Sequence, residues 1–139
     1  MIQTALDKKK TKFEAKKFVD LDFNFKTFSN KDVKTKLGEN SIKQSIKNIL
    51  MIDQYEKPFN PYFGAGLQDL LFEPITPTSA ITLKRRIEST LNNYEHRIFL
   101  ESTSVVANED DNRYDIVIKF SMIQAETSKS VEFFLERLR

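Results

Sequence analysis

The sequence contains no cysteine and a single histidine, His96. Without cysteine there is no disulfide, no thiolate metal ligand and no cysteine nucleophile, and this composition suits a reducing compartment. One histidine argues against a conventional metal site. The tract Gly64-Ala65-Gly66 lacks the lysine and the serine or threonine of a phosphate-binding loop. We therefore expect neither a metal nor a cofactor.

Long apolar segments are also missing. No run of apolar residues approaches the length needed to cross a bilayer. Residues 1–17 contain lysines but no apolar core of the kind found in a signal peptide. We therefore expect no membrane contact and synthesis in a cytoplasm.

The net charge of +2 hides an uneven distribution. Residues 1–47 carry 12 lysines and 6 acidic residues, whereas the rest of the chain carries 10 basic and 14 acidic residues. Three interpretations of the basic part are open: a solvated arm, an arm that orders on a partner, and a nucleic-acid contact. The basic part lacks the arginines and stacked aromatics of a dedicated nucleic-acid binder, so we expect no nucleic acid.

The 139 residues fit one domain of ordinary size. Residues 1–17 lack a sustained apolar pattern and are expected to form a basic N-terminal arm, with residues 18–139 as the folded domain. In residues 19–25 apolar side chains alternate with polar ones, which predicts a half-buried strand. The apolar residues of this strand are Val19, Leu21, Phe23 and Phe25.

Two main helices are expected after a polar loop over residues 30–38. The first begins with Asn40 or Ser41 as its cap and ends near Met51. The second is capped by Thr76, has Pro77 in its first turn and ends near Tyr94. Their apolar faces comprise Ile42, Ile46, Ile49 and Leu50 in the first helix, and Ala80, Leu83, Ile87, Leu91 and Tyr94 in the second. A short helical segment near residues 66–72 lies between them.

The C-terminal third predicts strands. Ile98–Val106 and Tyr114–Ile123 are rich in β-forming residues and are separated by an acidic turn, which indicates a hairpin. The terminal segment around residues 131–136 fits a third strand, with a terminal helix as the alternative. The expected fold is α+β, a single small domain in which two main helices pack on a small mixed β-sheet.

Prolines and glycines are few, and they cluster. All four prolines and two of the three glycines lie in residues 57–77, which fixes an uncommon loop path between the helices. The cluster reads Lys-Pro-Phe-Asn-Pro-Tyr-Phe-Gly at residues 57–64, and it is followed by Leu-Phe-Glu-Pro-Ile-Thr-Pro at residues 71–77 and by Asn-Tyr-Glu-His-Arg at residues 93–97. We expect at least two of the aromatics Phe59, Tyr62, Phe63 and Phe72 to join the core and the exposed ones to anchor an interface.

From about residue 41 to about residue 122, this succession of segments resembles the baseplate wedge proteins of contractile-tailed phages. These are small sheath-initiating subunits related to a component of the type VI secretion baseplate. The family has Glu-Pro-Arg where this chain has Glu95, His96 and Arg97, so the stiffening proline is absent. Residues before about Val19 match no part of the family pattern.

The resemblance implies a structural subunit of a virion tail baseplate, made in the host cytoplasm. It implies attachment to the helical core bundle of the wedge, for which Glu95, Arg97 and the aromatics Phe59, Tyr62 and Phe63 are the candidate contacts. It also implies that the tail sheath protein adds strands to a sheet edge, by β-augmentation. The candidate edge residues are Ile98, Leu100, Ile116, Ile118, Val131 and Phe133. Tail tube or hub proteins are further candidate partners.

Three alternatives are open. A type VI or extracellular contractile injection system has a related baseplate subunit. A peptidoglycan hydrolase would need a converging pair of carboxylates, and the spacing of Asp69, Glu73 and Glu95 does not indicate such a pair. A small regulatory adaptor is the third alternative. We expect no catalytic residues and no enzymatic activity.

Overall fold

The computed structural model describes residues 18–27, 29, 31–123 and 125–136, so the expected arm at residues 1–17 lies outside the described part. In chain order, the elements are β1 (Val19–Leu21), β2 (Thr35–Leu37), α1 (Glu39–Met51), α2 (Leu67–Leu71), α3 (Pro77–Tyr94), β3 (Ile98–Asn108), β4 (Arg113–Met122) and β5 (Ala125–Glu136). The α+β class is confirmed. The strands form two small antiparallel sheets, however, and not one mixed sheet.

The larger sheet has the strand order β3-β4-β5. The acidic turn joins β3 to β4 as predicted, and the register shifts once within β3, between Leu100 and Ser102. The terminal segment is a strand, β5, which pairs with β4 from Arg113 opposite Glu136 to Met122 opposite Ala125. Strand β4 is therefore central, and among the described residues β3 and β5 each have one edge without a neighbouring strand.

The helix ends follow the local sequence. Thr76 caps α3 in a reciprocal capping box, in which its side chain accepts from the backbone N–H of Ser79 while the Ser79 hydroxyl accepts from the N–H of Thr76. Pro77 occupies the first turn, where its missing N–H leaves no intrahelical bond unmade. Helix α1 starts slightly earlier than expected, with Gly38 as its cap.

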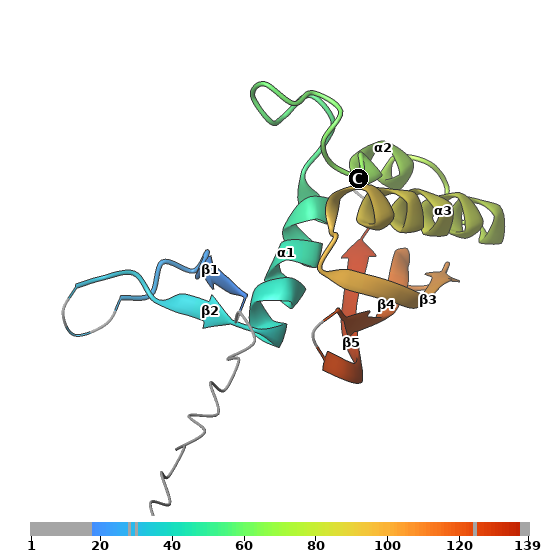
Figure 1. The fold of residues 1–139 in the computed structure, drawn as a ribbon. Helices are drawn as coiled ribbons and strands as arrows, with labels where there is room; N and C mark the ends of the chain where they lie inside the picture. Colours follow the sequence, from blue (N-terminus) through green and yellow to red (C-terminus); the bar gives the residue numbers. More distant parts are fainter. Residues whose placement is uncertain (1–17, 28, 30, 124, 137–139) are drawn as a thin grey trace, which may run out of the picture.

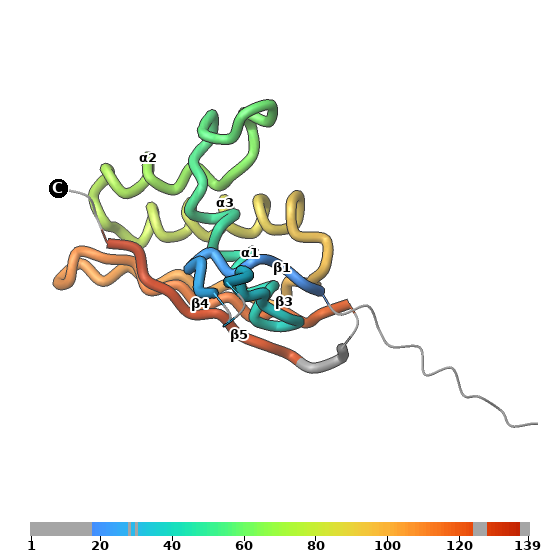
Figure 2. The backbone as a smooth tube through the Cα atoms, turned by 90° about the vertical axis from the view of Figure 1, so that its left-hand side faces the viewer, coloured from blue at the N-terminus to red at the C-terminus, as the bar shows by residue number. Residues whose placement is uncertain are grey.

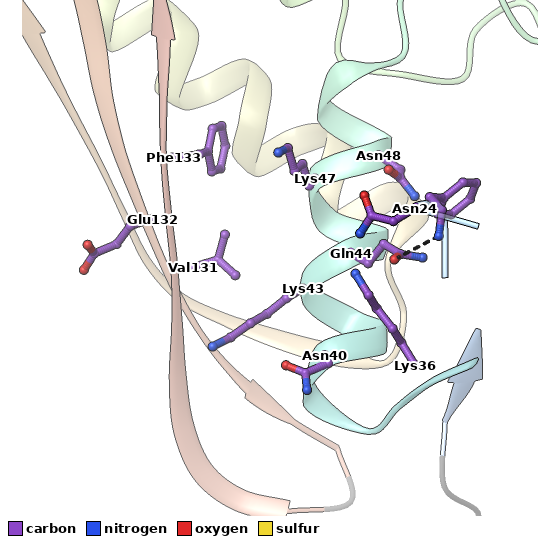
Figure 3. A pocket seen from close by; sticks show the side chains of 11 residues that line it. Asn24, Lys36, Asn40, Lys43, Gln44, Lys47, Asn48, Val131, Glu132 and Phe133 are labelled. Atoms are coloured by element: carbon purple, nitrogen blue, oxygen red, sulfur yellow. Dashed lines mark hydrogen bonds between the residues drawn. The ribbon is translucent and has the colours of Figure 1, made fainter. Parts of the chain in front are cut away.

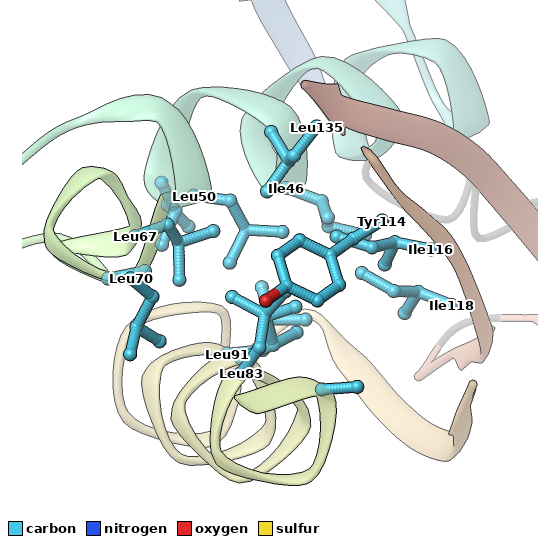
Figure 4. Close-up of a cluster of buried hydrophobic side chains, with 14 of the residues drawn as sticks. Ile46, Leu50, Leu67, Leu70, Leu83, Leu91, Tyr114, Ile116, Ile118 and Leu135 are labelled. Atoms are coloured by element: carbon cyan, nitrogen blue, oxygen red, sulfur yellow. The ribbon is translucent and has the colours of Figure 1, made fainter. Parts of the chain in front are cut away.

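The helices pack on one face of the larger sheet, and the core lies between them (Figures 1, 2 and 4). All of the predicted α1 face is buried, as are the alternate β4 residues Tyr114, Ile116, Ile118 and Phe120. The hydroxyl groups of Tyr114 and Ser79 lie 2.7 Å apart inside this core. This hydrogen bond satisfies the polar end of a buried tyrosine and ties the start of α3 to the central strand.

The N-terminal hairpin overturns one expectation. Strand β1 ends at Leu21 because the Asp22 carboxylate accepts from the backbone N–H of Asn24 (3.1 Å) and turns the chain. The apolar side chains predicted to be buried, Val19, Leu21, Phe23 and Phe25, are all more than half exposed. Asp22 is buried in their place. In Figure 1 the hairpin of β1 and β2 lies on the side of α1 away from the larger sheet.

Candidate functional site

The proline-rich loop between α1 and α2 presents aromatic side chains to solvent. Phe59 is fully exposed and Tyr62 is largely exposed, whereas Phe63 packs partly on the core with its ring centroid 4.8 Å from that of Tyr94. Phe72 is exposed as well. The expectation that at least two of these four aromatics would be buried is therefore wrong, because the loop path turns only Phe63 inward.

The loop is held in place by contacts to the body and by contacts within the loop. The Tyr94 hydroxyl donates to the carbonyl of Tyr62 (2.8 Å), and the N–H of Tyr55 donates to the carbonyl of Pro61 (2.7 Å). Gly64 has φ 108°, and a Cβ there would lie 2.2 Å from the carbonyl oxygen of Ile52. Only glycine permits this close approach. Phe59 and Tyr62 are thus exposed on a loop with a defined path, which lowers the entropy lost when a partner binds them.

Glu95 and Arg97 contact each other and the hairpin. Glu95 caps the C-terminal end of α3 and Arg97 precedes β3. Arg97 donates from Nε to Oε1 and from Nη2 to Oε2 of Glu95, both at 2.7 Å. Its Nη1 donates to Oδ2 of Asp20 (3.2 Å), an oxygen that also accepts from the Ser41 hydroxyl (2.5 Å). The cluster joins α3, β3, β1 and α1.

The charges in this cluster are stabilised by one another. Burial raises the pKa of the Glu95 carboxyl, but hydrogen bonds from Arg97 and Ser45 lower it, and the net pKa lies below its ordinary value of 4.5. The hydrogen bonds from Glu95 in turn raise the pKa of the Arg97 guanidinium. Both groups are therefore charged at neutral pH.

The two residues differ in their access to a partner. The Glu95 side chain is 4% exposed and the Arg97 side chain is 24% exposed. Arg97 occupies both oxygens of Glu95 inside the chain. The expectation that Glu95 contacts a partner stays a prediction. Arg97 retains an accessible surface, and His96 between them is exposed.

The strand-edge candidates separate into two groups. Ile98 and Leu100 lie on edge strand β3, and Val131 and Phe133 lie on edge strand β5. Ile116 and Ile118 lie on β4, which is hydrogen-bonded on both sides, so their assignment to an open edge is wrong. The alternation of residues revealed their burial, but it carries no information about strand order.

The edge of β5 borders a groove of about 510 Å³ beside α1 (Figure 3). Val131 and Phe133 point from β5 toward α1, and Lys43 and Lys47 extend from α1 into the same space. Strand β5 is 12 residues long and contains no proline. Its pairing with β4 has one register shift near the start of β5 and is regular from Ser128 to Glu136. A long regular stretch of edge strand is a template for strand addition.

Glu73 and Glu95, two of the carboxylates considered for hydrolysis, do not converge. Glu73 precedes the start of α3 and Glu95 caps its C-terminal end, so the 18-residue helix separates them. At 1.5 Å per residue this helix is roughly 27 Å long. A glycosidase pair is separated by about 5 to 9.5 Å. In addition, both oxygens of Glu95 are bound by Arg97, so Glu95 is neither a free nucleophile nor a protonated acid at neutral pH.

Metal sites and membrane spans are both absent from the described residues. The part of the chain that the structure describes contains no group of three or more histidine, aspartate or glutamate residues that could hold a metal ion. Within the same ranges, no helix has both the length and the apolar character of a membrane span.

Sequence reasoning missed the role of the hairpin. Asp20 contacts Arg97 across 77 positions of the chain, and no local pattern signals such a contact. The alternation itself was the only indication. It separates a polar face from the face of Val19 and Leu21, and either face could pack on α1.

Both the sequence and the fold are similar to those of known proteins. A family model described as baseplate wedge protein gp25 matches residues 36–127. The baseplate wedge protein gp25 of Enterobacteria phage T4 is 42% identical over 108 residues, which cover 78% of this chain and 82% of the T4 protein.

Solved structures share the fold. A putative tail lysozyme from Geobacter sulfurreducens superposes with a TM-score of 0.66 at 25% identity, covering 73% of this chain and 92% of that one. A chain of the anti-feeding prophage baseplate gives a TM-score of 0.61 at 17% identity, with 88% of each chain covered. A chain of the postcontracted pyocin R2 baseplate gives 0.60 at 21% identity, with 76% and 98% covered.

Proposed function

Since the chain belongs to the family of baseplate wedge protein gp25, we propose that it joins the wedge core of a contractile tail and provides the strand edge on which the first sheath ring assembles. The coarser role follows from the family: the protein is a baseplate component of a contractile phage tail. The expected family resemblance is thereby confirmed. The finer role rests on the surfaces described above.

The edge of β5 is the observation that carries the sheath proposal. An added strand would hydrogen-bond to the unpaired backbone groups of β5 and extend the order β3-β4-β5 by one. Each edge strand has one register shift against β4, but the shift in β5 lies near its start, so its pairing is uninterrupted from Ser128 to Glu136. The shift between Leu100 and Ser102, by contrast, divides the ladder of the shorter strand β3. Val131 and Phe133 form an apolar wall of the groove beside β5, so the incoming segment gains burial as well as backbone bonds.

The charges that line the groove favour an incoming strand of particular charge. The α1 wall of the groove carries Lys43 and Lys47, and Lys36 lines it from the hairpin. Lys43 is paired with Glu39 and Lys36 with Asp22, and Glu132 also lines the groove. An acidic side chain on the incoming strand would therefore meet Lys47 in particular. Charges placed in this way favour the correct partner and register more than they add raw affinity.

Paired proline variants in β5 test this proposal. In an edge strand of an antiparallel sheet, successive N–H groups point alternately to the neighbour and to the open edge. Of Lys129→Pro and Ser130→Pro, one therefore removes a bond to β4 and the other removes an outward donor. We expect the variant that keeps the wild-type unfolding midpoint to join baseplates and fail to start sheath growth. Normal sheath growth on those baseplates would exclude the β5 edge. Of Ser104→Pro and Val105→Pro in β3, the variant that keeps the wild-type unfolding midpoint is the matched control.

Attachment to the wedge core is assigned to Arg97 and the exposed loop. Arg97 is fixed by Glu95 and Asp20 and is still 24% exposed, so it presents a pre-oriented charge. Phe59 and Tyr62 add apolar area on the defined loop. Glu95 acts in this scheme by holding Arg97.

We further propose that the protein is not an enzyme. The similar Geobacter protein is described as a putative tail lysozyme. Peptidoglycan hydrolysis is therefore the activity to compare with the carboxylates of this chain. Glu73 and Glu95 lie at opposite ends of α3, and Glu95 is held as a carboxylate by Arg97. A structural role is the function that this geometry supports.

A further inference from the structure

The β1–β2 hairpin has an inverted arrangement of polar and apolar side chains. Val19 lies opposite Leu37 in the register, so these two share a face with Leu21, and all three are more than half exposed. Asp20 and its cross-strand partner Lys36 point to the other face. The hairpin therefore turns its polar face toward the body and its apolar face toward solvent.

Hydrogen bonds fix this orientation. Asp20 bonds with Ser41 and Arg97, as described above, and the Gln44 amide donates to the carbonyl of Leu21 (2.6 Å). Asp22 pairs with Lys36 inside the hairpin, at 3.4 Å. The bonds of Asp20 and of the Leu21 carbonyl attach the hairpin to the body of the protein, and turning the hairpin over would break them. The apolar face is therefore exposed because hydrogen bonds hold the hairpin in this orientation.

The apolar face continues into a groove. Val19, Leu21 and Phe23 line one side of a groove of about 490 Å³, and Ile52 lines it with Phe63. Arg97 borders the same groove. The hairpin face is therefore continuous with the surface assigned above to the wedge core.

The shape and charge of the surface define its occupant. Strands β1 and β2 have three residues each, which is too short to offer a useful ladder to a further chain segment. A row of apolar side chains beside a groove instead fits the apolar stripe of a helix. Asp20 and Asp22 pair with Arg97 and Lys36. Lys26, Lys31 and Asp32, in contrast, are exposed on the loop between the strands, which leaves an excess of positive charge there. The complementary helix carries acidic residues beside its stripe.

We propose that the outward face of the hairpin, formed by Val19, Leu21 and Leu37 and continued by the adjoining groove, binds an amphipathic helix of another baseplate protein that has acidic residues beside its apolar stripe. This inference rests on the proposed attachment to the wedge core. It extends the contact surface beyond Arg97 and the aromatic loop to residues near the start of the described chain.

The binding test uses wedge complexes isolated without this subunit as the probe. The double variant Val19→Ser, Leu21→Ser should keep the wild-type unfolding midpoint, because both side chains are exposed, and should raise the Kd at least about tenfold. Ile81→Ser removes a similarly exposed apolar side chain from α3 and should leave the Kd within about twofold. Lys26→Glu with Lys31→Glu should weaken binding more at low salt than at high salt.

A photo-crosslinking phenylalanine analogue at position 21 identifies the occupant in the assembled baseplate. The expected adduct is to a helix of another baseplate protein, near an acidic residue. An adduct to residues 1–17 of the same chain, an adduct to a second copy or the absence of an adduct would each overturn the inference. If the wild-type protein binds and the double variant binds equally well, the inference fails alone. If the wild-type protein does not bind the wedge complexes, the proposed attachment fails and the inference fails with it.

Discussion

The guanidinium of Arg97 donates two hydrogen bonds of 2.7 Å to the carboxylate of Glu95, and its third nitrogen donates to Asp20 on the hairpin. Glu95 and Arg97, with Asp20, therefore form an internal clasp between α3 and the hairpin, and we propose that the exposed part of Arg97 also contacts a partner. Because Glu95 is buried and Arg97 is partly exposed, we expect substitutions of the two residues to lower the free energy of unfolding by different amounts.

Replacing Arg97 should destabilise the protein more than replacing Glu95. Arg97→Met leaves a buried carboxylate unpaired, so we expect a loss of about 3 kcal/mol in the free energy of unfolding. Glu95→Gln leaves Arg97 with Asp20 and solvent, and we expect a loss of about 1 kcal/mol. Urea unfolding measures both. Lys84→Met, which breaks the exposed pair with Glu88 (3.9 Å), should change stability by less than about 0.5 kcal/mol. Equal losses of unfolding free energy in Arg97→Met and Glu95→Gln would contradict this expectation.

The same clasp predicts a pH dependence. The folded-state pKa of Glu95 lies below 4.5, so its contribution to stability is full above that pH and is lost as the pH falls through the folded pKa. In Arg97→Met the burial of Glu95 remains without its partner, which raises the folded pKa and reverses the sign. The difference in unfolding free energy between wild type and Arg97→Met should therefore shrink from pH 7 to about pH 4. A difference that stays constant over this range would show that the carboxylate is not the group responsible.

Glycine is required at position 64. Gly64→Ala places a methyl group 2.2 Å from the Ile52 carbonyl oxygen at φ 108°, so we expect a loss of more than about 2 kcal/mol and a displaced loop. Gly66→Ala is the matched control, because Gly66 has the left-handed φ of 55° and ψ of 43°, and a Cβ there would come no closer than 3.4 Å, to the side chain of Gln54. Its loss should be about 1 kcal/mol. Thermal unfolding ranks the two, and a larger loss for Gly66→Ala would contradict the close approach.

Removing residues 1–17 should leave the folded domain intact. This segment lacks a sustained apolar pattern, so the unfolding free energy should stay within about 0.5 kcal/mol of the full chain. A loss of several kcal/mol would show that the arm packs on the domain. Normal stability with failed baseplate assembly would identify the arm as a partner contact.

The purified protein should release no peptidoglycan fragments at acidic or neutral pH. The carboxylates Glu73 and Glu95 are separated by α3 and cannot act on one glycosidic bond. Turnover that persists through purification and disappears in both Glu73→Gln and Glu95→Gln would overturn the structural role. Weak turnover that is insensitive to both changes indicates a contaminating hydrolase.

The elements with local signals were predictable from sequence. The capping box at Thr76 and Ser79 and the helical spacing of Leu83 and Ile87 depend only on neighbours within a few residues. The β3–β4 hairpin follows from two β-rich segments around an acidic turn, and the buried face of β4 follows from its alternation.

The features that depend on distant partners were not predictable in the same way. Alternation in residues 19–25 groups Val19 with Leu21, but it does not say which face turns inward, and Arg97 with Ser41 decides that by binding Asp20. Strand order likewise depends on which segments meet in space. For this reason the pattern that predicts a buried Ile118 cannot show that its strand, β4, is central.

Amide hydrogen exchange in assembled tails tests the central claim most directly, because it reports on the backbone N–H groups that an added strand would pair. Peptides from residues 128–136 of β5 and residues 98–108 of β3 are compared in baseplates before and after the addition of sheath protein. The proposed role predicts new protection in β5 and little change in β3. Protection confined to β3, or unchanged exchange in both strands on baseplates that carry sheath, would contradict it.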